Sequence, residues 1–430
     1  MTTQTITPTA GPLDAVVRIP GSKSITNRAL LLAALADGVS TLSGVLFSDD
    51  SHWFLDGLRR LGVDVDIDQD RRQMVVHGVG GPPPAAEAAL WVELAGTAAR
   101  FLLAYSCLGS GSYTIDGNAR MRQRPMGDLL ATLNALGAEC RSTGEHNGLP
   151  IVVAGRGLRG GAAGLAGDKT SQFLSALLMV APYMREDVEI SITSPLAATP
   201  YIDITTSIMN TFGAHVQRDG YERFRVAAGQ RYQARDYQIE PDASNASYFF
   251  AAAALTGGHV RVEALDRHSI QGDIRFLDVL EQVGCVVTSG AGWVEVQGPE
   301  RLRGVDLDMS KLPDMAITLA ALAPFAAGPT HIRNVGLIRH HETDRIAATV
   351  TELRKLGVAV EEFADGMTIY PGWQQPAEIE SYHDHRMAMG FAVAGLKIPG
   401  LRIAGAECVA KTFPDFFERF AEMAGGVLGR

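Results

Sequence analysis

Cysteine is scarce in this sequence, and no two cysteines lie close together along the chain. The 430 residues include four cysteines, far apart and without a CxxC spacing. That pattern favours neither a disulfide framework nor a zinc site. The 11 histidines show no HExxH spacing, and the adjacent His340 and His341 are expected to point in different directions, which makes a poor metal pair. We therefore expect no metal site.

Excess positive charge and long apolar runs are also lacking. The formal net charge is -10, which argues against nucleic acid or an anionic membrane surface as a partner. No apolar run reaches the roughly 18 residues of a membrane span, and the opening MTTQTITPTAGPL lacks the charged and apolar regions of a signal peptide. We expect a cytoplasmic globular protein, and its length and 46% hydrophobic content predict two or more domains.

An internal repeat organises the chain. Five helical patterns end in a glycine that precedes strand-like text, at intervals of about 71 to 76 residues: Gly62, Gly137, Gly213, Gly284 and Gly357. Six apolar helices open with polar residues at intervals of about 69 to 73: Arg28, Arg100, Gln172, Asn245, Asp314 and Arg386. The repeat predicts six α/β units of about 72 residues, each with a buried helix, an amphipathic helix and strands.

The domain organisation follows from these units. The apolar helices are too hydrophobic for the outer layer of a solenoid, so two globular domains of three units each fit better. Turn residues at Pro20-Gly21 and near Glu240-Pro241-Asp242 mark the expected crossings. We predict a discontinuous domain of residues 1–20 plus 241–430, which contains both termini, and an inserted domain of residues 21–240.

Basic residues gather at the openings of the buried helices. Helix N-termini carry unpaired N–H groups and a partial positive charge, which suits anions. The cations at or beside these openings are Lys23, Arg28, Arg100, Arg124, Arg345, Arg386 and Lys411. Together they favour a small, multiply charged anion between the domains, whereas any single arginine is better explained as solvated surface. The loop Gly21-Ser22-Lys23-Ser24 lacks the spacing of a nucleotide-binding P-loop.

Many stretches match one family in order, from about residue 13 to the end: PGSKSITNRALLLAALA, AGTAARFL, RMRQRPMGDLL, SQFLSALLMVAP, PYIDIT, DASNASYFFAAAA, QGDIRF, PDMAITLA, HETDRIA, YHDHRMAM and AKTFPDFFE. The chain resembles the 5-enolpyruvylshikimate-3-phosphate synthase family. The resemblance implies a two-domain inverse α/β barrel of six βαβαββ repeats, three per domain, with the active site in the cleft between the domains. It also implies transfer of the enolpyruvyl group of phosphoenolpyruvate to the 5-hydroxyl of shikimate 3-phosphate, with release of phosphate and without metal or cofactor.

The resemblance also implies residue roles. Phosphoenolpyruvate would be held by Lys23, Gly96, Thr97, Arg124, Gln172, Arg345, Arg386 and Lys411. Shikimate 3-phosphate would be held by Ser24, Arg28, Thr170, Ser171, Gln172, Tyr201, Asp314 and His341. Asp314 would be the base at the 5-hydroxyl, and Glu342 would transfer a proton to carbon with help from His385 and Lys23. From sequence alone, Asp314 and Asp384 read equally well as helix caps, and Lys23 as an exposed loop lysine.

The acceptor side departs from the family pattern at three positions. His341, Ala198 and Leu337 stand where the family commonly has lysine, serine and asparagine. Either other residues compensate, or the acceptor is a related cyclitol or shikimate-like alcohol. Lys169 could supply the lost charge, although an exposed loop lysine is the better reading.

The stretch LAGTAARFL departs as well, at Leu94, Ala99 and Phe101. Because that loop lines the pocket occupied by glyphosate in the family, a bulkier Phe101 is expected to shift the helix that carries Gly96 and Thr97 and to reduce glyphosate sensitivity.

Two other readings are disfavoured. The related UDP-N-acetylglucosamine enolpyruvyl transferases use a loop cysteine, which residues 116–125 lack. A non-catalytic binding module would be expected to lose acid and base residues, yet Asp314, Glu342, His385 and Lys411 are present. We expect a monomeric enzyme with small-molecule substrates as its partners.

Overall fold

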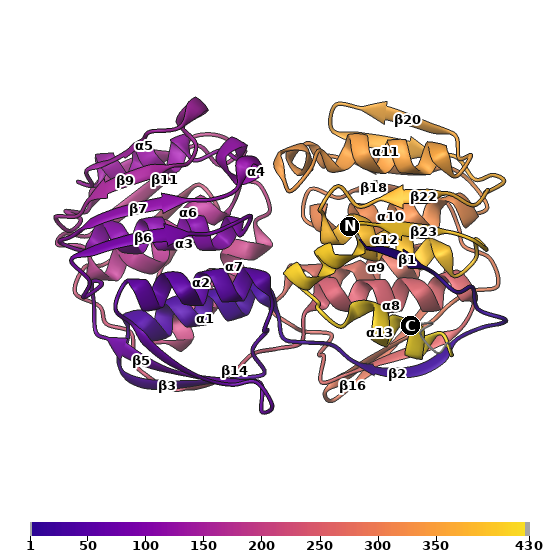
Figure 1. The fold of residues 1–430 in the computed structure, drawn as a ribbon, viewed down its shortest axis with the longest axis horizontal. Helices are drawn as coiled ribbons and strands as arrows, with labels where there is room; N and C mark the ends of the chain where they lie inside the picture. The colour runs from indigo at the N-terminus through magenta and orange to yellow at the C-terminus, as the bar shows by residue number, and fades with distance from the viewer. Residues whose placement is uncertain (1, 426–430) are drawn as a thin grey trace. The chain divides into compact units, whose positions relative to one another are not determined.

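The computed structural model describes residues 2–425. The chain divides into two compact units, Met1–Pro20 with Glu240–Arg430, here called the terminal unit, and Gly21–Ile239, here called the inserted unit (Figure 1). Among residues 2–425, no helix has both the length and the hydropathy needed to cross a membrane.

Three four-stranded sheets build the inserted unit. Their strand orders are β14-β3-β5-β4, β6-β7-β9-β8 and β10-β11-β13-β12. The bounds are β14 Asp236–Gln238, β3 Asp37–Ser43, β5 Gln73–Val79, β4 Asp64–Asp68, β6 Glu87–Trp91, β7 Ser112–Asp116, β9 Ile151–Ala154, β8 Cys140–Ser142, β10 Gly161–Leu165, β11 Val188–Ile192, β13 Arg223–Val226 and β12 Gln217–Asp219. In each sheet one parallel pair is followed by two antiparallel pairs. The sheets are therefore copies of one pattern.

The described residues of the terminal unit form three sheets of related pattern. Their strand orders are β16-β17-β15-β2, β18-β19-β21-β20 and β1-β23-β22. The bounds are β16 Val286–Gly290, β17 Trp293–Gln297, β15 His259–Glu263, β2 Asp14–Arg18, β18 Asp306–Asp308, β19 Thr330–Arg333, β21 Gly366–Ile369, β20 Val360–Phe363, β1 Thr3–Thr5, β23 Arg402–Ala404 and β22 Glu378–Glu380. The third sheet has only three strands, and β1 from the start of the chain occupies its antiparallel edge.

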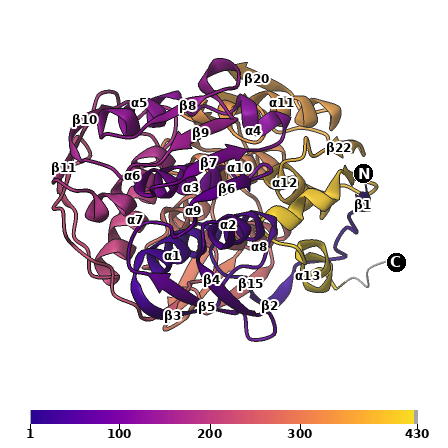
Figure 2. The ribbon, with the colours of Figure 1, turned by 60° about the vertical axis from the view of Figure 1, so that its left-hand side comes forward.

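The six apolar helices predicted from the repeat are confirmed as the buried centres of the two units. They are α1 Lys23–Leu35, α3 Gly96–Leu108, α6 Gln172–Val180, α8 Ala243–Thr256, α10 Ala316–Leu322 and α12 His385–Gly395. Every residue of α8 and α12 is buried, as expected of helices that are apolar on all sides. Figure 2 shows α1 beside the sheet of β3 and β5, which it contacts directly.

The second helix of each repeat is more amphipathic. These helices are α2 Asp49–Arg60, α5 Gly127–Ala135, α7 Pro200–Thr211, α9 Phe276–Gln282, α11 Arg345–Lys355 and α13 Phe416–Met423. The five glycines predicted to follow them adopt left-handed backbone angles, from φ 82° at Gly357 to 111° at Gly284. These caps let each chain segment leave its helix and enter the next strand.

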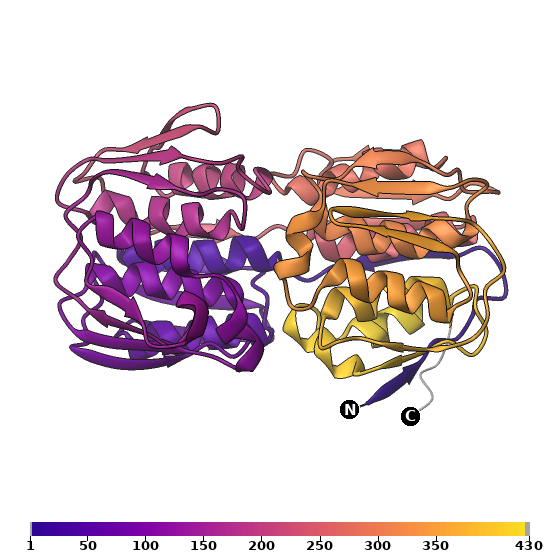
Figure 3. The same cartoon turned by 90° about the horizontal axis from the view of Figure 1, so that it is seen from above.

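The two crossings exchange strands between repeats. β2 directly precedes α1 of the inserted unit, yet it pairs in parallel with β15 of the terminal unit. Likewise β14 directly precedes α8 of the terminal unit but pairs in parallel with β3 of the inserted unit. In Figure 3 the indigo N-terminal strands lie along the orange and yellow part of the chain. Each crossing therefore separates a strand from the helix that follows it in sequence.

Gly21 begins the inserted unit, where only glycine fits. A Cβ atom at this position would lie 1.9 Å from the carbonyl oxygen of Gly44. This close backbone approach precedes α1, so it fixes where Lys23 enters the helix.

Candidate functional site

In the terminal unit, the charged network centres on Arg345, the first residue of α11. Its Nε and Nη2 atoms donate to both oxygens of Asp384, at 2.7 and 3.0 Å. Nη2 also donates to Glu342 Oε2 at 3.0 Å, and Nη1 donates to Asp314 Oδ1 at 2.9 Å. Arg345 is 2% exposed and Asp384 is fully buried. A buried arginine fork thus fixes three carboxylates in one place.

Asp314 lies between two guanidinium groups. Besides Arg345, Arg386 donates from Nη2 to Asp314 Oδ2 at 2.8 Å. Burial alone would raise the pKa of Asp314, but the charges of Arg386 and Arg345 hold this pKa well below its usual value. Asp314 is therefore a carboxylate rather than a carboxylic acid, in the state that accepts a proton. It lies in the short helical turn Pro313–Met315 before α10, whose N-cap residue is Leu312, so Asp314 does not occupy the N-cap position.

Asp384 caps the N-terminus of α12, and the same cap contacts the backbone of Arg386. The Asp384 carboxylate accepts a hydrogen bond from the backbone N–H of Arg386 at 2.9 Å while it holds Arg345. The cap and the ion pair are thus made by the same carboxylate. His385 Nδ1 lies 3.8 Å from Asp384 Oδ1, and His385 is 2% exposed.

His341 also lies in this network. Arg345 Nη1 lies 3.0 Å from His341 Nδ1, which accepts a hydrogen bond from it in the tautomer protonated at Nε2. The same nitrogen lies 3.6 Å from Asp314 Oδ1. Lys411, at the end of the 3-10 helix Ala406–Lys411, lies 3.7 Å from Glu342 Oε1. The structure therefore brings together all the predicted site residues of this unit.

Asp273 belongs to the same network but was missed by the sequence analysis. Ser244 donates to Asp273 Oδ2, and Arg386 Nη2 lies 3.3 Å from the same serine hydroxyl. Burial and the negative charge of Asp314 raise the pKa of Asp273 to about 6. The available signals were the QGDIRF motif at 271–276, which was read as part of the match, and Asp273 itself, which was read as the start of a helix.

In the inserted unit, Lys23 is the first residue of α1 and is paired. Its Nζ lies 3.2 Å from Asp50 Oδ2, and the Asp50 side chain is 5% exposed. Asp50 is a second residue missed from the sequence, where it resembles a helix-start aspartate at the opening of α2. The structure thus places a buried carboxylate against the lysine of the PGSK loop.

Arg28 is buried within the inserted unit and bonded only to neutral oxygens. It donates from Nε to Thr205 Oγ1 at 2.7 Å, from Nη2 to Ser175 Oγ at 3.1 Å and to the Tyr201 carbonyl at 3.3 Å, and from Nη1 to the Ser24 carbonyl at 3.0 Å. Among residues 2–425, no carboxylate lies within ion-pair distance of it. Burial lowers the pKa of Arg28 to about 10. A buried cation with only neutral partners favours binding of an external anion.

The first turn of α3 brings Gly96 against two arginines. A Cβ at Gly96 would lie 2.5 Å from Arg124 Nη1 and 2.7 Å from Arg100 Nη1. Arg100 donates to the Gly96 carbonyl at 3.0 Å, and Arg124 Nη1 lies 3.5 Å from the Leu94 carbonyl. Thr97 follows in the same turn and is half-buried. Glycine therefore allows both guanidinium groups to approach the helix N-terminus.

The residues before α6 form a separate local group. The Gln172 N–H donates to Thr170 Oγ1 at 3.2 Å, and Ser171 is buried. Gln172 Oε1 is buried and accepts no hydrogen bond from the described residues. Lys169 forms an exposed ion pair with Asp128 at 2.7 Å, which fits the reading of a surface lysine.

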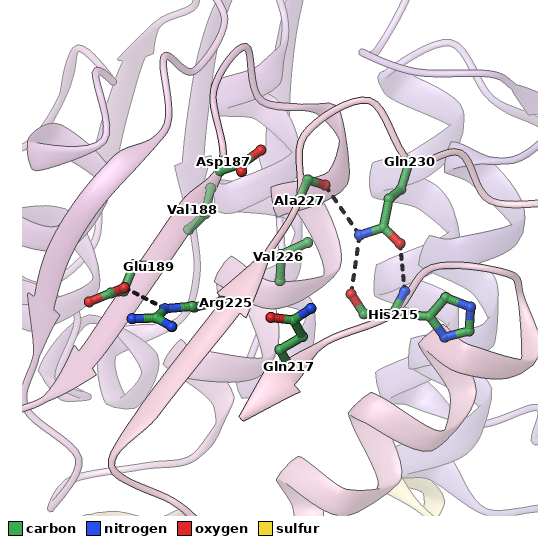
Figure 4. Close-up of a pocket in the computed structure, with 9 residues that line it drawn as sticks. All are labelled: Asp187, Val188, Glu189, His215, Gln217, Arg225, Val226, Ala227 and Gln230. Atoms are coloured by element: carbon green, nitrogen blue, oxygen red, sulfur yellow. Dashed lines mark hydrogen bonds and ion pairs between the residues drawn. The ribbon is translucent and has the colours of Figure 1, made fainter. Parts of the chain in front are cut away.

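A hollow of about 400 Å³ elsewhere in the inserted unit contains none of the predicted site residues (Figure 4). It lies over β11, β12 and β13, where Gln230 bonds the backbone of His215 and Arg225 pairs with Glu189 at 2.6 Å. These side chains pair with one another across an open sheet face, so the hollow has no evident link to the predicted chemistry.

Comparisons with known proteins identify the family. The family model of EPSP synthase (3-phosphoshikimate 1-carboxyvinyltransferase) matches residues 8–420. A curated 3-phosphoshikimate 1-carboxyvinyltransferase of Trichormus variabilis is 54% identical over 414 residues, which is 96% of this chain and 97% of the relative. One of Herminiimonas arsenicoxydans is 46% identical over 417 residues, 95% of this chain and 94% of the relative.

A solved structure of EPSP synthase from Acinetobacter baumannii superposes with a TM-score of 0.81 at 26% identity, covering 98% of each chain. This likeness confirms the predicted mixed α/β fold in two domains. The chain therefore belongs to the EPSP synthase (3-phosphoshikimate 1-carboxyvinyltransferase) family.

Proposed function

We propose that this protein transfers the enolpyruvyl group of phosphoenolpyruvate to the 5-hydroxyl of shikimate 3-phosphate and releases phosphate. Family membership supports the reaction class, because the matched model and the curated relatives carry that name. The observation that carries the proposal is the ionised Asp314 held between Arg345 and Arg386, with Glu342 on the same arginine.

The proposed chemistry needs one base and one acid. Asp314 takes the proton of the 5-hydroxyl while the hydroxyl oxygen attacks the enol carbon of phosphoenolpyruvate. Glu342, assisted by Lys23 and His385, delivers a proton to the methylene carbon, which gives a tetrahedral ketal. Loss of phosphate and of a methyl proton then restores the enol. Arg345 and Arg386 keep Asp314 in place and ionised without themselves taking up its proton, since arginine remains charged.

The phosphoenolpyruvate site is proposed from the charged residues of the matched motifs. In the terminal unit, the three fixed cations Arg345, Arg386 and Lys411 are outnumbered by the carboxylates of Asp273, Asp314, Glu342 and Asp384. That cluster alone is poorly suited to a multiply charged anion. As the resemblance implies, the proposal also assigns Lys23, Arg124, Gly96, Thr97 and Gln172 to phosphoenolpyruvate.

For the acceptor, Arg28 is proposed to bind the carboxylate, because it is buried with neutral partners only. The remaining contacts are assigned to Ser24, Thr170, Ser171, Gln172, Tyr201, Asp314 and His341. Apart from Arg28, this set contains no arginine or lysine for the phosphate of the acceptor, and Lys169 pairs with Asp128. That observation keeps a related shikimate-like alcohol as the second candidate acceptor.

The test is phosphate release from phosphoenolpyruvate by the purified protein, with shikimate 3-phosphate and plain shikimate as parallel acceptors. Turnover that is strong only with the phosphorylated acceptor supports the proposal. Turnover that prefers plain shikimate favours the second candidate, and absence of turnover with both acceptors rejects the assigned reaction. We further propose that the protein is a cytoplasmic monomer. Light scattering after gel filtration tests its oligomeric state.

A further inference from the structure

The aromatic ring of Phe101 packs on the guanidinium group of Arg28. The Arg28 Cζ atom lies 5.5 Å from the ring centroid, although the two residues belong to different helices, α3 and α1. Phe101 is fully buried and Arg28 is 2% exposed. The contact is therefore inside the inserted unit and shielded from water.

The Phe101 ring adds to the surroundings of Arg28, whose hydrogen-bond partners are all neutral oxygens. The hydroxyl and carbonyl oxygens that bond Arg28 approach the edge of the guanidinium, because its N–H groups lie in the plane of the group. An aromatic ring interacts with a cation through the negative charge above its face, and the attraction grows when water is excluded. Phe101 thus contributes stabilisation where the described residues supply no carboxylate.

Phe101 also contacts a second aromatic ring, that of Phe54. Phe54 of α2 meets Phe101 edge to face, with centroids 6.2 Å apart and an interplanar angle of 70°. Phe54 is also fully buried, but no contact of its ring with Arg28 is found among the described residues. The two phenylalanines therefore share one core environment and differ in whether they contact the arginine.

We propose that Phe101 is a positioning residue for Arg28 and so determines how well the carboxylate of the acceptor is bound. The inference rests on the proposed function, in which Arg28 receives that carboxylate. Phe101 acts through Arg28 and contacts no reacting atom. Loss of the ring leaves the guanidinium free to tilt, which weakens a two-point interaction with a planar carboxylate.

The experiment compares Phe101→Leu with the matched core substitution Phe54→Leu. Steady-state kinetics are measured with shikimate 3-phosphate and with its carboxyl methyl ester, which keeps the ring and the phosphate but has no carboxylate. For Phe101→Leu we expect KM for the acid to rise about tenfold, in line with a buried cation–π contact, while KM for the ester and for phosphoenolpyruvate stay within about twofold. For Phe54→Leu, all three constants should stay within about twofold of wild type.

Several outcomes would overturn the inference. Equal effects of Phe101→Leu on acid and ester show that the ring does not act through the carboxylate, and equal effects of the two leucine variants show general loss of packing. A change confined to phosphoenolpyruvate points to the start of α3 instead. If Phe101→Leu does not fold, Phe101→Met, which fills more of the space, is measured with the same substrates. A wild-type protein that does not use shikimate 3-phosphate rejects the proposed function, whereas an active wild type with indistinguishable variants rejects this inference alone.

Discussion

Arg386 Nη2 lies 2.8 Å from Asp314 Oδ2, so the proposed base is in direct contact with a cation that is 8% exposed. The contact has two effects on the carboxylate. It keeps Asp314 ionised far below neutral pH, and it fixes the direction of the Oδ2 atom. A base of this kind works through placement, because an oxygen with a low pKa is intrinsically a weak proton acceptor.

Asp314→Asn is expected to lower kcat by about 10²- to 10⁴-fold, because the amide cannot accept the hydroxyl proton. KM for either substrate should change far less. The control is Asp308→Asn, which removes the same charge from an exposed position that bonds Ser310 and Asn334. Initial rates of phosphate release check the prediction, and a kcat within a few-fold of wild type would remove Asp314 from the role of base.

Asp273→Asn is expected to change the free energy of unfolding in a pH-dependent way, with its stability relative to wild type higher at pH 8 than at pH 4.5. The folded-state pKa of about 6 lies above the usual value near 4, so the folded state takes up a proton between these values that the unfolded state does not. The stability linked to this proton is fully present below about pH 4 and is lost as the pH rises through about 6. The variant carries no such titration, so its free energy of unfolding, relative to that of wild type, should be about 1 to 3 kcal/mol larger at pH 8 than at pH 4.5.

Urea unfolding at both pH values measures this difference. Asp70→Asn, on an exposed turn of the inserted unit, removes the same charge and serves as control. The same offset at pH 4.5 and pH 8 for the Asp273 variant would mean that its carboxyl does not titrate near 6.

Gly96→Ala is expected to raise KM for phosphoenolpyruvate by about 10- to 100-fold, because the added methyl group displaces Arg124 and Arg100 from the start of α3. KM for the acceptor should change much less. Gly81→Ala is the control, since a Cβ there meets only ordinary contacts at 3.8 Å and beyond. An unchanged phosphoenolpyruvate KM would show that Arg124 does not depend on this approach.

The wild-type protein is expected to resist glyphosate more than a sensitive family member does. Phe101 fills a fully buried position five residues after Gly96 in α3, and its bulk is proposed to shift the first turn of that helix enough to weaken binding of glyphosate but not of phosphoenolpyruvate. The inhibition constant against phosphoenolpyruvate, measured side by side for both enzymes, checks this. Equal constants would contradict it.

The sequence predicted the repeating parts of the fold because they depend on local patterns. The buried helices are apolar on every side, and the glycines after the amphipathic helices, such as Gly284, take the left-handed angles that L side chains rarely adopt. The predicted crossings placed β2 with the terminal domain and β14 with the inserted domain, but the partner of each strand could not be predicted, because a strand of three to five residues reads the same beside any partner. The closed barrel form of each domain stays a prediction.

The candidate site was predicted unevenly for a similar reason. The cations stood out because their side chains lie beside helix openings, whereas Asp50 and Asp273 resemble ordinary helix-start aspartates in the sequence. Only the structure shows that Asp50 faces Lys23 across two helices and that Asp273 reaches Arg386 through Ser244. Such partners are distant in the chain, so no local pattern reports them.

The pairing of the first two strands with late ones has a consequence for synthesis on the ribosome. The β2 residue Asp14 is aligned with His259, and the β1 residue Thr3 with Ala404. At about 5 to 20 residues per second, β2 waits roughly 10 to 50 s for its partner, while the contiguous inserted unit can already fold. During that time both strands are open edges, which invite pairing with other nascent chains. The polar TQT of β1 and the charged ends of DAVVR in β2 make such errors less favourable.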